Sequence, residues 1–145
     1  MAVRRVDPDE AAELVDQGWT YLDVRSVAEF EGGHAPGAFN IPLLDFVPGQ
    51  GLRPNANFLR EVLDAFEADR PLVVACKAGG RSATAAAMLA DAGYTNLVDM
   101  RGGFYGEVDP DGMVSCAGWA PRGLPVVTGA EPGRDHRDLK KPPPH

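Results

Sequence analysis

Three short apolar runs, separated by helical patterns, constrain the fold of this chain more than any other feature. They are "YLDV" at 21–24, "PLVVACK" at 71–77 and "NLVDMRGG" at 96–103. Runs of this length with consecutive apolar positions are typical of strands that are buried on both faces. Because helices alternate with them, they predict an α/β fold in three layers, with a parallel central sheet and helices on both faces.

The segments between these runs carry helix and loop signals. Asp7 is placed to cap a helix, with Pro8 at its first position, Glu10 completing a capping-box pattern and Gly18 ending it. Further helices are predicted over 26–33, 57–69 and 81–94, and a short strand over 38–43. The segment 48–57 contains two glycines and two prolines and is predicted to be a loop.

The chain is predicted to form one domain over residues 1–128. Its 145 residues are enough for one sizeable core. From Gly129 onward, the sequence "GAEPGRDHRDLKKPPPH" loses its apolar periodicity. Such a segment cannot bury enough apolar surface to offset the entropy lost on ordering, so residues 129–145 are predicted to be a disordered tail.

Charge and residue counts exclude several classes of function. The net charge of −7 argues against nucleic acid or an acidic membrane surface as the main partner. No apolar run is long enough to span a membrane, and the N-terminus lacks the apolar stretch of a secretory signal. Cys76 and Cys116 do not make a disulfide framework, so we expect a reducing, cytoplasmic setting. His34 is the one histidine before the predicted tail, which argues against a zinc site or a Cys–His protease, and no metal or cofactor is expected.

The sequence "ACKAGGRSA" places Cys76 where a buried strand gives way to a helix. In open α/β sheets, ligands bind at this carboxyl end of the strands. The adjacent glycines of this turn allow backbone N–H groups to point at one anion, next to a helix N-terminus. The amides, the helix dipole and the charges of Lys77 and Arg81 favour a thiolate on Cys76. The alternative is an inert buried cysteine, but that alternative does not explain two glycines flanked by cations.

These residues resemble the active-site loop of rhodanese-type sulfurtransferases, in which a cysteine is followed by two residues, a glycine, one residue and an arginine. Cys76, Gly79 and Arg81 occupy those places. The segment "YLDVRSVAEFEGGHAPGAFNIPL" at 21–43 is similar to the first signature of the same family, and "NLVDMRGGFYGEV" and "GWAPRGLPV" are similar to its closing segments. The resemblance covers about residues 3–127 and rests on several separated motifs.

The resemblance implies a single rhodanese domain that carries sulfane sulfur as a persulfide on Cys76. The donor would be thiosulfate, mercaptopyruvate or a small persulfide, and the acceptor cyanide, a thiol or a protein. The loop amides could stabilise the persulfide anion by short hydrogen bonds. The residues expected to form this cradle are Lys77, Ala78, Gly79, Gly80, Arg81 and Ser82. Lys77 either meets the sulfonate end of thiosulfate or is a solvated lysine on the rim, and Arg81 has a partly structural role.

Several charged residues outside the loop are expected to be structural. The resemblance implies that Asp23, Arg25 and Glu29 form an internal group of salt bridges and hydrogen bonds, since buried charges require partners. His34 is expected to fix a loop by hydrogen bonding. Arg101 or the glycine turn after it is expected near the rim of the site.

Cys116 and Trp119 are expected to be packing residues. Cys116 lies away from any cation-rich turn of the sequence, which favours an inert thiol, although it could also resolve a persulfide on Cys76 by forming a disulfide. Trp119 is expected to cap the core.

Two other functions compete with sulfur transfer. The active-site loops of cysteine phosphatases and arsenate reductases have a His-Cys pair followed by five residues and an arginine. Here Ala75 replaces the histidine, and four residues separate Cys76 from Arg81. The shorter loop suits one sulfur atom better than a phosphate. The other competing function is a regulatory module or a sulfur carrier that serves one protein partner. The intact Cys76 argues against the regulatory module but not against the sulfur carrier.

Overall fold

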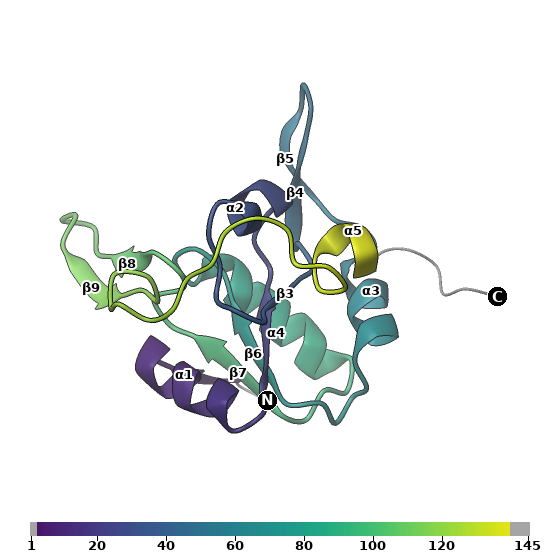
Figure 1. Ribbon diagram of the computed structural model, residues 1–145, viewed down its shortest axis with the longest axis horizontal. Coiled ribbons are helices and arrows are strands. Elements are labelled where there is room, and N and C mark those ends of the chain that lie inside the picture. The colour runs from purple at the N-terminus through teal and green to yellow at the C-terminus, as the bar shows by residue number, and fades with distance from the viewer. Residues whose placement is uncertain (1–2, 140–145) are drawn as a thin grey trace.

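The computed structural model describes residues 3–139, and its centre is a five-stranded sheet in the order β1-β7-β6-β2-β3. Every pairing in this sheet is parallel, with Asp23 opposite both Ala75 and Asn40 (Figure 1). The strands are β1 (Arg4–Val6), β2 (Thr20–Asp23), β3 (Phe39–Asn40), β6 (Leu72–Ala75) and β7 (Leu97–Met100). The parallel sheet predicted from the apolar runs is confirmed. The short edge strand β1, with two of its three residues exposed, has no apolar run that would predict it.

Helices cover both faces of this sheet, as the sequence predicts. They are α1 (Pro8–Asp16), α2 (Val27–Glu31), α3 (Phe58–Ala65), α4 (Gly80–Asp91) and α5 (His136–Leu139). Val62 of α3 and Leu89 of α4 pack into the core on one face. Ala11 of α1 and Phe30 of α2 pack into the core on the other. The α/β architecture with three layers is therefore confirmed.

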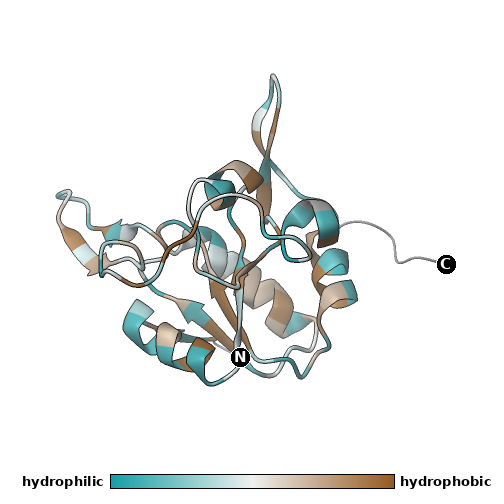
Figure 2. Ribbon diagram, viewed as in Figure 1, coloured by the Kyte–Doolittle hydropathy of each residue, from teal (hydrophilic) through white to brown (hydrophobic). Residues whose placement is uncertain are grey.

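The central strand β6 separates the two cores. Leu72 and Val74 belong to the core on the α3–α4 side, and Val73 and Ala75 to the core on the α1 side. Successive side chains of a strand point to opposite faces, so a strand covered on both sides is apolar throughout, as the sequence LVVA of β6 and its brown colour show (Figure 2). The alternation continues to Cys76, whose side chain falls on the α3–α4 side.

Helix α1 begins where the sequence predicts. The carboxylate of Asp7 accepts a hydrogen bond of 2.9 Å from the backbone N–H of Glu10, and Pro8 occupies the first turn. The capping box is incomplete, because the carboxylate of Glu10 instead pairs with Arg4. Gly18 follows the helix with a φ of 105°, a conformation that favours glycine.

Two antiparallel hairpins project from the sheet and are not predicted by the sequence. One joins β4 (Leu44–Val47) to β5 (Gly51–Pro54), and the other joins β8 (Gly106–Val108) to β9 (Val114–Ala117) (Figure 1). The prediction of a loop over 48–57 is therefore wrong for the β5 strand. The hairpins bury little, with Phe46 60% exposed and Met113 67% exposed, so their sequences lack the alternation of a half-buried strand.

Residues 129–139 do not form the disordered tail that the sequence predicts. The backbone carbonyl of Arg134 accepts a hydrogen bond from the N–H of Asn40, on the edge strand β3, at 2.8 Å. The ring of His136 contacts both carboxylate oxygens of Glu61 at 3.0 and 3.1 Å, and both side chains are buried. The segment thus covers a sheet edge and satisfies a buried carboxylate, so the fold continues past residue 128. Residues 140–145 of the predicted tail lie outside the described residues.

Arg25 forms the most deeply buried ion pair of the fold. Its guanidinium is fully buried and donates two hydrogen bonds to the carboxylate of Asp23 through Nε and one through Nη2, which also donates to the carbonyl of Gly33 at 2.8 Å. Its Cζ lies 4.3 Å from the centre of the Phe104 ring. The pair therefore joins the end of β2 to two loops, which agrees with the structural role expected of both residues.

A helix that could cross a bilayer, long and sufficiently apolar, is not found among residues 3–139.

We expect Arg25→Ala to lower the free energy of unfolding by about 3–5 kcal/mol, because it leaves the Asp23 carboxylate buried without its cation. Urea denaturation of the two proteins at neutral pH measures the difference. Arg4→Ala is the matched control, because Arg4 pairs with Glu10 at the surface and its loss should cost less than about 1 kcal/mol. Equal losses in the two variants would contradict the role assigned to the buried pair.

Candidate active site

Cys76 directly follows β6, between the carboxyl ends of β2 and β7. The chain turns through residues 76–79, and α4 begins at Gly80. The structure thus places all the loop residues that the sequence singled out, Cys76 through Ser82, at the end of the sheet where ligands bind in open α/β folds.

The thiol of Cys76 is 2% exposed and contacts polar groups of its own loop. The backbone N–H of Gly79 donates to Sγ at 3.1 Å. The Oγ atom of Ser82 lies 3.5 Å from the same sulfur, at the first turn of α4. The sulfur is therefore held as the acceptor of a backbone amide, an arrangement that favours a negative charge on it.

The carbonyl groups of Cys76 and Lys77 point toward the turn that follows β7. The N–H of Phe104 donates to the carbonyl of Cys76 at 2.7 Å, and the N–H of Tyr105 donates to the carbonyl of Lys77 at 3.0 Å. In a planar trans peptide the N–H points opposite to the C=O, so the amides of Lys77 and Ala78 face the other way. The twelve-residue helix α4 also has no side-chain cap among residues 3–139, which leaves its first amides available to an anion.

Two glycines allow this packing. A Cβ atom on Gly103 would lie 2.5 Å from the carbonyl oxygen of Cys76 and 2.5 Å from the carbonyl carbon of Lys77, so no other residue fits without moving the loop. Gly79 has a φ of 115°, in the region that favours glycine, and it supplies the amide that contacts the sulfur. The glycine turn after Arg101 therefore supports the loop from beneath, whereas Arg101 itself pairs with Glu107 at the surface.

Arg81 is tied to α2 by a bidentate ion pair. Its two terminal nitrogens donate to the two carboxylate oxygens of Glu29 at 2.7 and 2.9 Å. Glu29 also accepts hydrogen bonds from the backbone and the side chain of Ser26, which caps α2. Burial alone would raise the pKa of Glu29, but the hydrogen bonds from Arg81 and Ser26 outweigh it and lower the pKa to about 2. Arg81 thus fixes the position of the loop relative to α2.

Lys77, Ala78 and Gly80 form the exposed rim of the loop. The Nζ atom of Lys77 lies 5.9 Å from the centre of the Tyr105 ring. Lys77 is therefore in a position to meet an anion that approaches the loop from solvent.

Asp99 is a buried carboxylate of β7 that the sequence analysis did not single out. Its Oδ1 atom accepts a hydrogen bond of 2.6 Å from Ser82, and its Oδ2 atom accepts one of 3.1 Å from Nε of Arg5. Burial raises the pKa of Asp99, against the opposing hydrogen bonds from Ser82 and Arg5. The signal for this residue is a carboxylate inside the apolar run "NLVDM", because a charge on a buried strand requires partners.

His34 and Cys116 are placed differently with respect to the loop. His34 stacks on Phe30 and donates from Nδ1 to the carbonyl of that residue at 2.7 Å, so it fixes a loop away from the thiol. The sequence suggests that Cys116 lies away from cations, but in the structure Nη2 of Arg122 lies 3.5 Å from its sulfur. The backbone turn at Gly102 brings Cys116 close to the glycine turn under the Cys76 loop, since a Cβ on Gly102 would lie 3.0 Å from the Cys116 sulfur.

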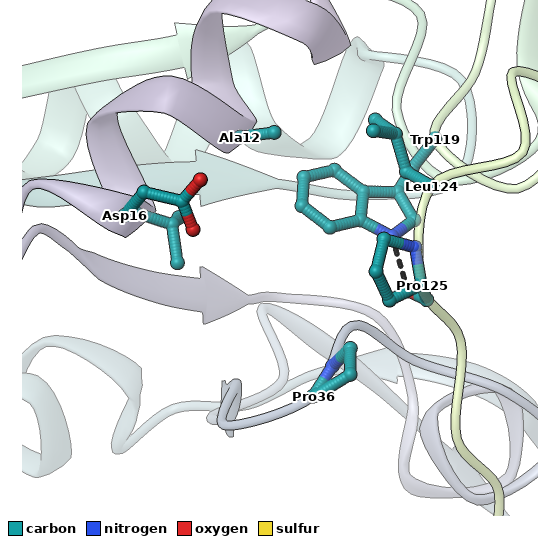
Figure 3. A pocket seen from close by; sticks show the side chains of 7 residues that line it. Ala12, Asp16, Pro36, Trp119, Leu124 and Pro125 are labelled. Atoms are coloured by element: carbon teal, nitrogen blue, oxygen red, sulfur yellow. Dashed lines mark hydrogen bonds between the residues drawn. The ribbon is translucent and has the colours of Figure 1, made fainter.

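A pocket of about 230 Å³ lies away from the thiol. Figure 3 shows the side chains that line it, and the indole N–H of Trp119 donates to the carbonyl of Pro125 at 2.7 Å. The lining residues are Ala12, Val15, Asp16, Pro36, Trp119, Leu124 and Pro125. None of them belongs to the Cys76 loop, so this pocket is not the space in which Cys76 reacts. Trp119 also packs edge-on against Tyr21, with ring centres 5.3 Å apart, and therefore caps the core as expected.

Among residues 3–139, the side chains of His, Cys, Asp and Glu nowhere gather in a group of three or more that could hold a metal ion.

Comparisons with known proteins agree on one family. The sequence pattern of the rhodanese-like domain matches residues 7–107. Thiosulfate sulfurtransferase 16 of Arabidopsis thaliana, a chloroplastic protein, is 36% identical over 116 residues, which are 80% of this chain and 86% of that protein. Thiosulfate sulfurtransferase GlpE of Pseudomonas syringae is 33% identical over 70% of this chain and 83% of its own. The crystal structure of Rv0390 from M. tuberculosis superposes with a TM-score of 0.72 at 27% identity, covering 89% of this chain and all of that one.

We expect Gly103→Ala to lower the free energy of unfolding by more than about 1–2 kcal/mol and to slow the alkylation of Cys76 by iodoacetamide. The added Cβ forces the carbonyl groups of Cys76 and Lys77 to move, which disturbs the amides around the sulfur. Gly37→Ala is the matched control, because Gly37 has a φ of 79° and open space around its Cβ position. A Gly103→Ala variant that alkylates as fast as the control would show that the glycine turn does not set the loop.

We expect the contribution of Glu29 to stability to disappear in acid. Because its pKa falls from an ordinary 4.5 to about 2 on folding, the stabilisation is complete above pH 4.5 and is lost as the pH falls through about 2. Denaturation of the wild-type protein and Glu29→Gln over this range measures it, and the difference in unfolding free energy between them should shrink steadily. A difference that stays constant would mean that Glu29 is not held ionised by Arg81.

Proposed function

The chain belongs to the rhodanese-like domain family, and we propose that it is a sulfurtransferase that carries sulfane sulfur as a persulfide on Cys76. The observation that carries this proposal is the thiol of Cys76, with its sulfur accepting the Gly79 amide at the uncapped N-terminus of α4. Backbone donors in this geometry stabilise a sulfur anion, which is the state required both for attack and for holding the transferred sulfur.

In the first half-reaction the Cys76 thiolate attacks the outer sulfur of thiosulfate. The new bond joins the Cys76 sulfur to the transferred sulfur, the sulfur–sulfur bond of thiosulfate breaks, and sulfite leaves with its electron pair. The persulfide keeps one negative charge on its outer sulfur, near the amides of residues 77–82. Lys77 on the rim is suited to meet the sulfonate end of the donor, because its ammonium is exposed beside the loop.

In the second half-reaction an acceptor removes the outer sulfur. Cyanide or a thiolate attacks that atom, its bond to the Cys76 sulfur breaks, and the electron pair of this bond returns to Cys76 as a thiolate. The products are thiocyanate or a new persulfide. Because Cys76 leaves as the same anion that attacks thiosulfate, the loop amides serve both halves of the reaction.

The position of Arg81 argues against a phosphatase or an arsenate reductase. A tetrahedral oxyanion would need the guanidinium for binding, but both terminal nitrogens of Arg81 donate to Glu29. The loop also has only four residues between Cys76 and Arg81. These features leave space and donors for one sulfur atom.

A protein acceptor is a second candidate within the same chemistry. The hairpin β8–β9 begins next to the loop, because the N–H of Gly106 donates to the carbonyl of Lys77 at 3.4 Å. It carries exposed apolar side chains, with Val108 61% and Val114 65% exposed, which suit contact with another protein. Rapid loading of Cys76 by thiosulfate together with slow thiocyanate production would favour this role as a sulfur carrier.

The cytoplasmic location inferred from the two cysteines stays a prediction.

We expect incubation with thiosulfate to add one sulfur atom to the protein, and subsequent cyanide to remove it as thiocyanate. Intact-mass spectrometry measures the first step and a colorimetric thiocyanate assay the second. Cys76→Ser should lose both, because it removes the only atom that bonds to the transferred sulfur, and Cys116→Ser should keep both. The proposal is wrong if the Cys76→Ser variant still gains a sulfur atom and still produces thiocyanate. Hydrolysis of an aryl phosphate that depends on Cys76 would instead support the phosphatase hypothesis.

A further inference from the structure

A chain of short contacts connects the Cys76 sulfur to a buried carboxylate. The Oγ atom of Ser82 lies 3.5 Å from the sulfur and 2.6 Å from Oδ1 of Asp99. On the far side, Oδ2 of Asp99 accepts from Arg5 at 3.1 Å. Asp99 is 2% exposed, so the hydroxyl of Ser82, and not solvent, is in contact with its Oδ1 atom.

The hydroxyl of Ser82 has a single proton to give. While Cys76 is a thiol, the S–H can donate to Ser82 and Ser82 can donate to ionised Asp99. When the sulfur is an anion, the chain runs in the reverse direction if protonated Asp99 donates to Ser82 and Ser82 donates to the sulfur, although the carbonyl of Gly79 at 3.2 Å is a second acceptor for the same hydroxyl. If Asp99 kept its charge while the sulfur was an anion, the single proton of Ser82 could face only one of these two anions. The oxygen of Ser82 would then turn a lone pair toward the other anion, which is unfavourable.

We propose that Asp99 takes up, through Ser82, the proton that Cys76 gives up on becoming a persulfide anion, a role that rests on the sulfur-transfer function proposed above. Loading the site then adds no net charge to the interior. Asp99 does not touch the sulfur donor and is a positioning residue for this proton.

The balance of the step is simple. The thiol proton passes from the Cys76 sulfur to Ser82, the proton of Ser82 passes to Oδ1 of Asp99, and the electron pair of the S–H bond remains on the sulfur. The sulfur attacks thiosulfate, and sulfite leaves. The site carries one negative charge before the step, on Asp99, and one after it, on the outer sulfur of the persulfide.

The charges that face Asp99 favour this uptake. Burial raises the pKa of its carboxyl group, and Ser82 and Arg5 act against that increase. Arg5 from β1 is the cation in contact, but its Nη2 also lies 3.9 Å from the carboxylate of Glu107 in β8. Arg5 is therefore shared between two carboxylates.

Among residues 3–139, the buried and half-buried cations near Cys76 are already paired with carboxylates, Arg25 with Asp23 and Arg81 with Glu29. Arg81 from α4 interacts electrostatically with the thiol, but it forms its ion pair with Glu29. Tyr21 from β2 is buried, and burial followed by the charges of Asp23 and Cys76 raises the pKa of its hydroxyl, so it stays neutral. Two adjacent anions here would therefore meet backbone amides but no unpaired buried cation among residues 3–139, and like charges at such separations disfavour double ionisation.

The test counts protons released on sulfur loading. At about pH 6 an ordinary thiol keeps its proton. A persulfide is the stronger acid, because its second sulfur withdraws electrons. Loading by thiosulfate in weak buffer, with a pH indicator, is compared between Cys116→Ser and the double variant Cys116→Ser/Asp99→Asn. Sulfite takes up the same fraction of a proton in both reactions, so the difference reports the protein.

We expect Asp99→Asn to release about one more proton per persulfide formed than the protein that keeps Asp99. Ser82→Ala should show the same excess, because it interrupts the chain while leaving the Asp99–Arg5 pair intact. Asp64→Asn, which removes an exposed carboxylate from α3, should show none. Alkylation with iodoacetamide leaves a neutral sulfur and should release one proton from every protein, which verifies that the thiol starts protonated.

Equal proton release from the proteins with Asp99 and with Asn overturns the assignment of Asp99, whatever the rate of turnover. The outcome is separable from failure of the proposed function, in which no protein gains the mass of a sulfur atom. Should Asp99→Asn fail to fold, as circular dichroism would show, the Ser82→Ala comparison decides alone.

Discussion

The fully buried guanidinium of Arg25 is the interaction on which the site depends. It neutralises Asp23 at the end of β2, binds the carbonyl of Gly33, and lies over the ring of Phe104. The backbone N–H of Phe104 in turn holds the carbonyl of Cys76. One cation thus fixes the strand end, the loop after α2 and the turn beneath the thiol, and a charge so expensive to bury requires all of these contacts to be correct at once.

The site divides its tasks between backbone and side chains. The backbone N–H of Gly79 donates to the sulfur, and the carbonyl groups of Cys76 and Lys77 are oriented by hydrogen bonds from the glycine turn at 102–106. The side chains of Arg81 and Glu29 pair with each other and hold the loop against α2. Peptide dipoles carry no proton that they can lose near neutral pH, so the cradle keeps its character where a histidine would change charge.

The sequence predicts those parts of the fold that are local or continuous. The loop around Cys76 is contiguous, and β2, β6 and β7 are apolar runs, so both could be identified. Asp99 and Arg5 meet the loop from distant positions, and no local pattern indicates which partner a buried carboxylate will find. The packing of residues 129–139 was missed for the same reason, because it depends on His136 meeting Glu61, 75 residues away. The exposed hairpins lack the burial that produces a periodic pattern.

The segment that ends in α5 has a consequence for anyone who shortens this chain. Besides the contact of His136 with Glu61, it brings Glu131 within 3.1 Å of His34 and lays the guanidinium of Arg134 over the ring of Phe39. A cut at residue 128, beyond the stretch 7–107 that the family pattern matches, would expose the edge of β3 and leave a carboxylate of α3 enclosed without its imidazole. The packed structure therefore extends past the stretch that the family pattern matches.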